Sequence, residues 1–325
     1  MKEGRNRAVW GKTALACIAT LSLGYVLIKE VSAVHHPTVS ANPAAVLHTA
    51  QLNFANTSFT THNEDQEMKI PEANIEQYPF RLYQQDRYVH AYASYSEAVS
   101  EAKGLSNTSL YFKSKDKLIW ASDKPLASDA QVDAPLIYQM PELQRGCEVT
   151  SLAMLLQSAG VDVDKMTLAD DIIKDASPFE IIDHEIHFGN PNDGFVGDIV
   201  SFDNPGYGVY HGPIMSLAEQ YLPRKIIDAT GGNFDDILRF VEMGAPVWVI
   251  TNMEYQTLDD DAFETWETEE GGIDITYKEH SVLITGFDED TIYIHDPLGE
   301  EEQVNRDDFA AAWEQMGQQA ISYVR

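Results

Sequence analysis

One cysteine stands in a setting suited to nucleophilic chemistry. Cys147 directly follows Gly146, and an amphipathic helix is predicted from the cysteine to Gly160. Its apolar face would consist of Val149, Leu152, Ala153 and Leu156. A thiol at the start of a helix lies near unpaired N–H groups that stabilise a thiolate, whereas the neighbouring Glu148 acts in the opposite direction. Cys147 is therefore a candidate nucleophile, and an inert buried cysteine is the alternative.

A histidine and an aspartate that could activate this thiol lie more than 130 residues downstream, on two consecutive predicted strands. If Phe287 pairs with Thr291 across the short turn between them, His280 and Asp296 lie on one face as near-diagonal neighbours. The competing His295 would then lie on the opposite face. A base on one strand with its orienting carboxylate on the next is what a Cys–His–Asp mechanism requires.

The segment Pro135–Leu156 resembles the opening motif of the papain-like cysteine peptidases of family thirty-nine, in the stand-alone form of the relatives of bacteriocin-leader processing peptidases. The shared pattern is Gln, Pro, Glu-Leu and Gly-Cys-Glu before a helix that contains Ser, Leu and Met. Glycine- and tyrosine-rich stretches and a His-x-Val…Asp-Pro pattern extend the likeness to about Asp296. The resemblance implies that Cys147 is the nucleophile and that Gln139 is the oxyanion-hole glutamine, with Gln144 as the alternative.

The predicted fold class is α+β. We expect a papain-like domain with the nucleophile helix packed on an antiparallel sheet, preceded by a small α+β module and an N-terminal apolar helix. Cys147 would attack an amide carbonyl, His280 would act as base and then acid, Asp296 would orient the imidazole, and Gln139 would stabilise the oxyanion. No cofactor or metal is expected, because the two histidines in 183–187 lack the spacing of a helical zinc motif.

Four segments follow one another along the chain. Residues 1–33 are predicted to be a signal peptide or membrane anchor, because basic residues precede an apolar run. Residues 34–78 are predicted to be a flexible linker, 79–122 a module of four strands and one helix, and 130–325 the peptidase domain. Positive-inside orientation then places the protein on the extracellular side of the cell membrane or in the secreted fraction.

The net charge of the chain limits the kinds of molecule that it is expected to bind. The 325 residues carry a net charge of −30, and residues 130–325 hold nine Lys or Arg against thirty-nine Asp or Glu. Such a field excludes nucleic acid and favours cationic or neutral partners, although a solubility adaptation is the simpler interpretation. The strongly acidic stretch 258–272 is predicted to be an exposed loop.

The expected substrate is a peptide or protein, including cationic or cell-wall peptides. Two alternatives remain open at this level. One is a peptidoglycan endopeptidase or amidase on the same fold, and the other is a non-catalytic surface binding module. Membrane association through the N-terminal segment is compatible with each of them, and the sequence determines neither the substrate specificity nor the oligomeric state.

Overall fold

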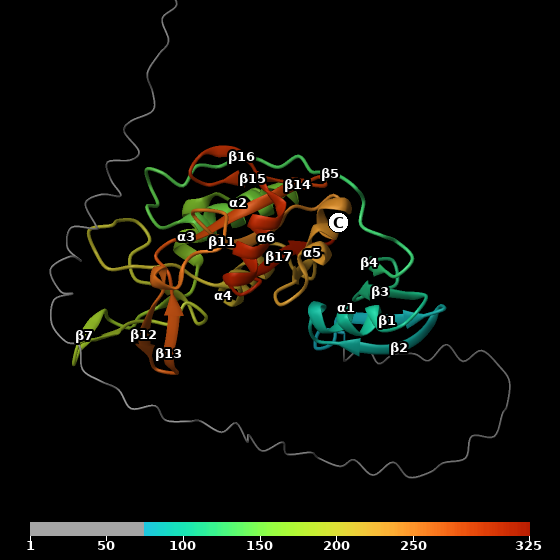
Figure 1. Cartoon of the computed structure of the whole chain (residues 1–325), viewed down its shortest axis with the longest axis horizontal. Helices are drawn as coiled ribbons and strands as arrows, with labels where there is room; N and C mark the ends of the chain where they lie inside the picture. The colour runs from blue at the N-terminus through green and yellow to red at the C-terminus, as the bar shows by residue number, and fades with distance from the viewer. Residues whose placement is uncertain (1–74) are drawn as a thin grey trace, which may run out of the picture. The chain divides into compact units, whose positions relative to one another are not determined.

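The structure is a computed structural model that describes residues 75–325 (Figure 1). The predicted signal peptide or apolar helix in residues 1–33 and nearly all of the predicted linker 34–78 lie outside these residues. Of the helices within the described part of the chain, none is long and apolar enough to cross a membrane.

The first described elements form a four-stranded antiparallel sheet, in the order β2-β1-β3-β4, with one helix. They are β1 (Phe80–Gln84), β2 (Arg87–Tyr92), α1 (Tyr95–Lys103), β3 (Thr108–Phe112) and β4 (Leu118–Ala121). The hydroxyl of Ser94 caps α1 by accepting a hydrogen bond from the Glu97 N–H at 3.2 Å. These four strands and one helix are the elements predicted for residues 79–122.

The remainder is built on a second antiparallel sheet, with seven strands. Six follow the order β10-β17-β11-β14-β15-β16. The seventh, β5, pairs with the C-terminal end of β14. The strands are β5 (Ala130–Gln131), β10 (Ile226–Asp228), β11 (Val247–Asn252), β14 (Glu279–Phe287), β15 (Thr291–Asp296), β16 (Glu300–Asn305) and β17 (Ala320–Tyr323).

Helices cover both faces of this sheet. On β11, Trp248 and Ile250 belong to the apolar cluster that contains α2, α3 and α4, whereas Val247 and Val249 belong to the cluster that contains α5 and α6. The alternation follows from the period of two in a strand. The helices are α2 (Cys147–Ser158), α3 (Lys165–Asp171), α4 (His211–Tyr221), α5 (Phe234–Glu242) and α6 (Arg306–Gln315).

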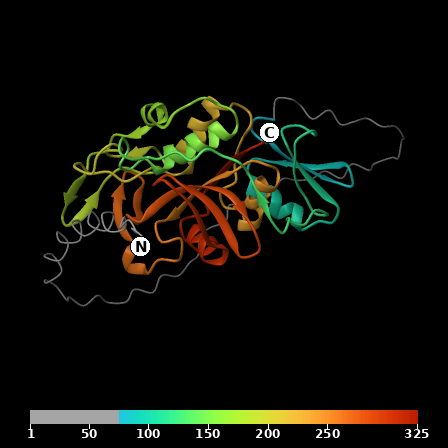
Figure 2. The ribbon, with the colours of Figure 1, turned by 90° about the horizontal axis from the view of Figure 1, so that it is seen from above.

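Helix α2 packs against β14 and β11, so the predicted contact of this helix with an antiparallel sheet is present (Figure 2). The predicted amphipathic character is wrong, because every residue from Cys147 to Leu156 is buried. The sheet covers one side of α2, and α3 and α4 cover others. A helix surrounded in this way has no solvent face to keep polar.

The acidic stretch predicted as a loop is instead largely a hairpin. A 3₁₀ turn, Asp260–Ala262, precedes β12 (Glu264–Thr268) and β13 (Gly271–Ile275). These two strands join β8 (Glu185–His187) and β7 (Glu180–Ile182) in a four-stranded sheet, while β6 (Lys174–Asp175) pairs with β9 (Phe195–Val196). Trp266 is fully buried, with its ring 5.4 Å from that of Phe188 and 5.2 Å from that of Tyr207. This one inward aromatic side chain holds a hairpin whose other face is charged.

The small module and α5 share one apolar cluster and one buried carboxylate. Asp236 on α5 accepts hydrogen bonds from Lys103 Nζ at 2.6 Å and from Trp120 Nε1 at 3.2 Å. Its backbone carbonyl accepts a third from the Tyr95 hydroxyl at 3.1 Å. The elements of the predicted module therefore pack directly on the sheet-and-helix unit that follows it.

Candidate active site

His280 and Asp296, the histidine and aspartate predicted from strand parity, form a direct pair. His280 Nε2 lies 2.8 Å from Asp296 Oδ1, and both side chains are buried. A carboxylate that accepts from Nε2–H leaves the Nδ1 lone pair of the ring as the position that can take a proton. His295 lies on the other face, with Nδ1 3.3 Å from the Pro135 carbonyl.

The turn that sets this register differs from the predicted one. Phe287 pairs with Ile292 rather than with Thr291, which alone would move the histidine and the aspartate to opposite faces. An irregularity between Ile284 and Gly286 inserts one extra residue into β14 and restores the predicted pairing toward the site. The side chains therefore meet because two departures from the simple hairpin compensate each other.

Two further groups hold the Asp296 carboxylate. Oδ1 accepts a hydrogen bond from the Leu298 N–H at 2.8 Å, and Oδ2 accepts one from the Tyr255 hydroxyl at 2.6 Å. Burial acts to raise the pKa of Asp296, but the hydrogen bond and charge of His280 and the Tyr255 hydroxyl outweigh it and the pKa is lowered. The carboxylate is thus kept ionised and fixed in orientation.

Cys147 lies at the first position of α2, as predicted. A side chain at the preceding Gly146 would overlap Leu143, so only glycine fits this approach. The backbone of Ser281, the residue after His280 on β14, acts to lower the pKa of the thiol. Among the described residues the thiol donates to Glu148 Oε2 at 3.3 Å, and no hydrogen bond joins it to the His280 ring.

The surroundings of the thiol favour its neutral form. Burial, followed by the charges of Glu148 and Glu279, raises the pKa of Cys147 well above its usual value, although the Ser281 N–H acts to lower it. The helix N-terminus therefore does not decide the protonation state of this cysteine. A thiolate must be generated by proton transfer to a nearby base.

Glu148 is fully buried beside the thiol. Its Oε1 accepts a hydrogen bond from the Val209 N–H at 2.8 Å. Burial raises the pKa of Glu148 to about 7, although that N–H and its own backbone N–H act to lower it. Burial and the charge of Glu148 likewise raise the pKa of Glu279. The pair therefore retains a proton near neutral pH, which reduces the negative charge that faces the sulfur.

The two candidate glutamines each make one side-chain hydrogen bond within the described residues, through different atoms. Its Nε2 donates to the Gln144 carbonyl at 3.2 Å, and its buried Oε1 has no hydrogen-bond partner among the described residues. The side chain of Gln144 instead accepts from the Phe202 N–H at 2.7 Å. The backbone of Gln139 is fixed by Pro297, whose carbonyl accepts its N–H at 2.7 Å, and by Lys165 Nζ, which donates to its carbonyl at 2.9 Å.

Comparison with known proteins identifies the family. The model of the peptidase C39-like family matches residues 131–321, which is more than half of the chain. The chain belongs to the peptidase C39-like family. This confirms the resemblance stated from the sequence motif, including its stand-alone form. Membership in this family indicates a peptidase.

Two relatives of this C39-like chain illustrate the likeness. The uncharacterized protein YvpB of Bacillus subtilis (strain 168) is 44% identical over 204 residues, which covers 62% of this chain and 78% of YvpB. A crystal structure described as a C39-like peptidase from Bacillus anthracis is 49% identical, with a TM-score of 0.57. That similarity covers 61% of this chain and 98% of the crystallised one.

Three residues around the site were not found from the sequence. Glu279 could have been, because strand parity places it on the face opposite to His280, the face that α2 covers. Tyr255 follows the end of β11 in a segment without a periodic pattern. Lys165 opens α3 and contacts the Gln139 loop only through the tertiary fold.

Proposed function

We propose that this chain is a papain-like cysteine peptidase that hydrolyses peptide amide bonds through Cys147, His280 and Asp296. The observation that supports it most is the buried 2.8 Å hydrogen bond between His280 and Asp296, next to the strand backbone that faces the Cys147 sulfur. Family membership supports the same activity.

The proposed reaction assigns one role to each of these residues. Cys147 gives its proton to His280 Nδ1 as the sulfur attacks the substrate carbonyl carbon. Gln139 Nε2 and the Cys147 backbone N–H donate to the resulting oxyanion. The imidazolium, oriented by Asp296, then protonates the leaving amine and the C–N bond breaks. Water hydrolyses the acyl-thioester with His280 again as base, which restores the thiol.

We also propose that the protein acts outside the cytoplasm, secreted or held at the extracellular side of the membrane. The basic residues before the apolar run in 1–33 support this proposal. The chain's charge of −30 favours cationic or neutral peptides over anionic ones as substrates. Fractionation of cells that express the tagged full chain, followed by protease shaving, tests the location. Protection of the tag from external protease would contradict export.

The activity test uses the purified full chain and two substrate sets, a peptide library and a muropeptide digest, with products identified by mass spectrometry. We expect cleavage of peptide amide bonds by the wild-type chain and none by Cys147→Ala. Cleavage confined to muropeptides would identify a cell-wall endopeptidase or amidase. If the wild-type chain and Cys147→Ala are equally inactive on both sets, a binding module replaces the peptidase proposal.

A further inference from the structure

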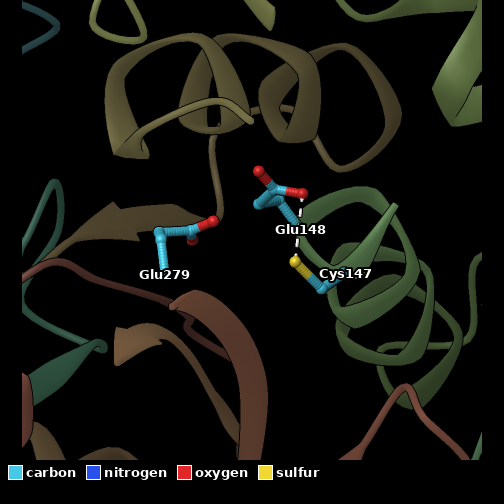
Figure 3. Close-up of side chains that lie close together, drawn as sticks. All are labelled: Cys147, Glu148 and Glu279. Carbon is cyan, nitrogen blue, oxygen red and sulfur yellow. Dashed lines mark hydrogen bonds between the residues drawn. The ribbon is translucent and has the colours of Figure 1, made fainter. Parts of the chain in front are cut away.

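Cys147, Glu148 and Glu279 form a compact cluster of one sulfur and two carboxylates, called here the thiol–carboxylate cluster. One ligand atom from each residue lies within 4.8 Å of the other two. Glu148 comes from the first turn of α2, and Glu279 is the first residue of β14. In Figure 3 the Glu279 carboxylate extends toward the other two side chains, and the sulfur and Glu148 are joined by their hydrogen bond.

Within residues 75–325, the cluster has no ion-pair partner. Among the ion pairs of the described residues, none includes Glu148 or Glu279. Glu279 Oε1 is a buried atom without a hydrogen-bond partner within the described part of the chain. A buried carboxylate oxygen without a partner is costly, so a bound cation would stabilise it.

The backbone at Gly208 packs closely against the two carboxylates. Gly208 faces the cluster, and a side chain there would overlap Glu148 Oε1 and approach Glu279 Oε2 to 3.2 Å. Because Gly208 has no side chain, its backbone can lie directly against both carboxylates. The same loop fixes Glu148, since the Val209 N–H donates to its Oε1.

We propose that the thiol–carboxylate cluster is a Zn²⁺ site and that the bound ion holds the peptidase inactive. This inference rests on the proposed function and adds a regulator to it. A thiolate and two carboxylates suit Zn²⁺, which takes sulfur at about 2.3 Å and carboxylate oxygen at about 2.0–2.2 Å. The three ligand atoms lie within 4.8 Å of one another, so binding requires the side chains to move toward the ion. The expectation that the protein binds no metal is based on the spacing of histidines, and this cluster contains none.

The chemistry of the switch is a ligand exchange without a redox step. Binding of Zn²⁺ forms a Zn–S bond and releases the Cys147 proton to solvent. The sulfur lone pair is then committed to the ion and cannot attack a carbonyl carbon. Removal of the ion and return of a proton restore the thiol on which the peptidase reaction depends.

The test measures metal binding apart from activity. The full chain is freed of metal with a chelator and titrated with Zn²⁺ against a competing chromophoric chelator. Co²⁺ is used in parallel, because a thiolate ligand gives it a ligand-to-metal charge-transfer band. Glu279→Gln removes one ligand of the cluster. Glu269→Gln makes the same change on the exposed turn after β12 and is the matched control.

We expect wild type and Glu269→Gln to bind one Zn²⁺ with equal affinity and Glu279→Gln to bind at least about tenfold more weakly. Cys147→Ser, which keeps nearly the same volume, should lose the Co²⁺ charge-transfer band. Zn²⁺ should also protect Cys147 from alkylation in wild type. Equal binding by Glu279→Gln and wild type, or a Co²⁺ spectrum without the thiolate band, would overturn the proposal by placing the ion on other acidic groups.

The two proposals can fail separately. If the metal-free chain cleaves peptides but binds no Zn²⁺, the metal site is wrong and the peptidase stands. If Zn²⁺ binds with a thiolate signature and the metal-free chain cleaves nothing, the site stands but the ion does not regulate a peptidase. Circular dichroism of Glu279→Gln establishes that it folds, and Cys147→Ser tests the site independently of that variant.

Discussion

Two histidine–aspartate pairs of equal length lie in different surroundings in this protein. The nitrogen–oxygen distance is 2.8 Å both between His280 and Asp296 and between His211 and Asp228. The first pair exposes 3% and 5% of its side chains, and the second exposes 29% and 31%. A hydrogen-bond distance alone therefore does not distinguish the pair proposed to be catalytic from the other pair.

The neighbours of the two pairs make the difference. Asp296 is held by the Tyr255 hydroxyl, and the strand that carries His280 faces the Cys147 sulfur. His211 is the first residue of α4, where its backbone N–H donates to Gln319 Oε1 at 2.9 Å. It lines a cavity that contains no cysteine. Burial and the hydrogen bond from Tyr255 set the first pair apart from the second, and the proposed chemical role belongs to the first pair.

The largest contrast is expected between the two histidines. His280→Gln removes the base of the proposed reaction and should lower kcat/KM by about 10⁴-fold or more. The kcat/KM of His211→Gln should stay within about threefold of wild type, because His211 lines a cavity that contains no cysteine. Both are measured by steady-state hydrolysis of a peptide cleaved in the library screen. Equal losses of kcat/KM in the two variants would show that the two histidines do not differ in function.

A smaller but parallel contrast is expected between the two aspartates. Asp296→Asn keeps the shape of the side chain but no longer fixes the Nε2–H tautomer, so kcat should fall by about 10²- to 10⁴-fold. Asp228→Asn, at the exposed pair, should leave kcat nearly unchanged. The comparison is made at saturating substrate. An unaffected kcat in Asp296→Asn would mean that the ring needs no oriented carboxylate.

Tyr255→Phe tests the outer contact of the buried pair through stability. The change leaves Asp296 Oδ2 without its 2.6 Å donor, so the free energy of unfolding should fall by about 1.5–3 kcal/mol. Tyr221→Phe is the control, since that hydroxyl donates to the exposed Asp171 and should contribute less than about 0.5 kcal/mol. Urea denaturation measures both. Similar losses of unfolding free energy in the two variants would show that burial does not strengthen the hydrogen bond between Tyr255 and Asp296.

The smallest expected effect is in the pH dependence of stability. The pKa of Asp296 is lowered below its ordinary 3.8 in the folded protein. Its carboxylate therefore stabilises the fold above that pH, and the contribution is lost as the pH falls through the lowered value. The stability difference between wild type and Asp296→Asn should narrow in urea titrations from pH 6 to pH 3. A difference that widens toward acid would reverse the assigned direction of the shift.

Local sequence patterns determine much of the secondary structure of this protein. The elements of the module, the start of α2 at Cys147 and the strands that carry His280 and Asp296 all follow from side-chain periodicity and from capping by Ser94 or glycine. These features depend on residues a few positions apart, so the sequence contains them directly. The resemblance to the family motif adds Gln139 as an expected oxyanion-hole residue.

Only the tertiary structure determines how distant segments meet. The bulge before Gly286 restores the register that the turn alone would break, and Trp266 turns an acidic stretch into a hairpin by inserting into the core. The surroundings of Cys147 arise in the same way, because Glu279 and Tyr255 reach the site from strands and loops far along the chain. Burial of Cys147, followed by the charges of Glu148 and Glu279, then outweighs the effect of the helix N-terminus on the thiol pKa. Desolvation depends on every group that packs around an atom, and no local stretch of sequence specifies that set.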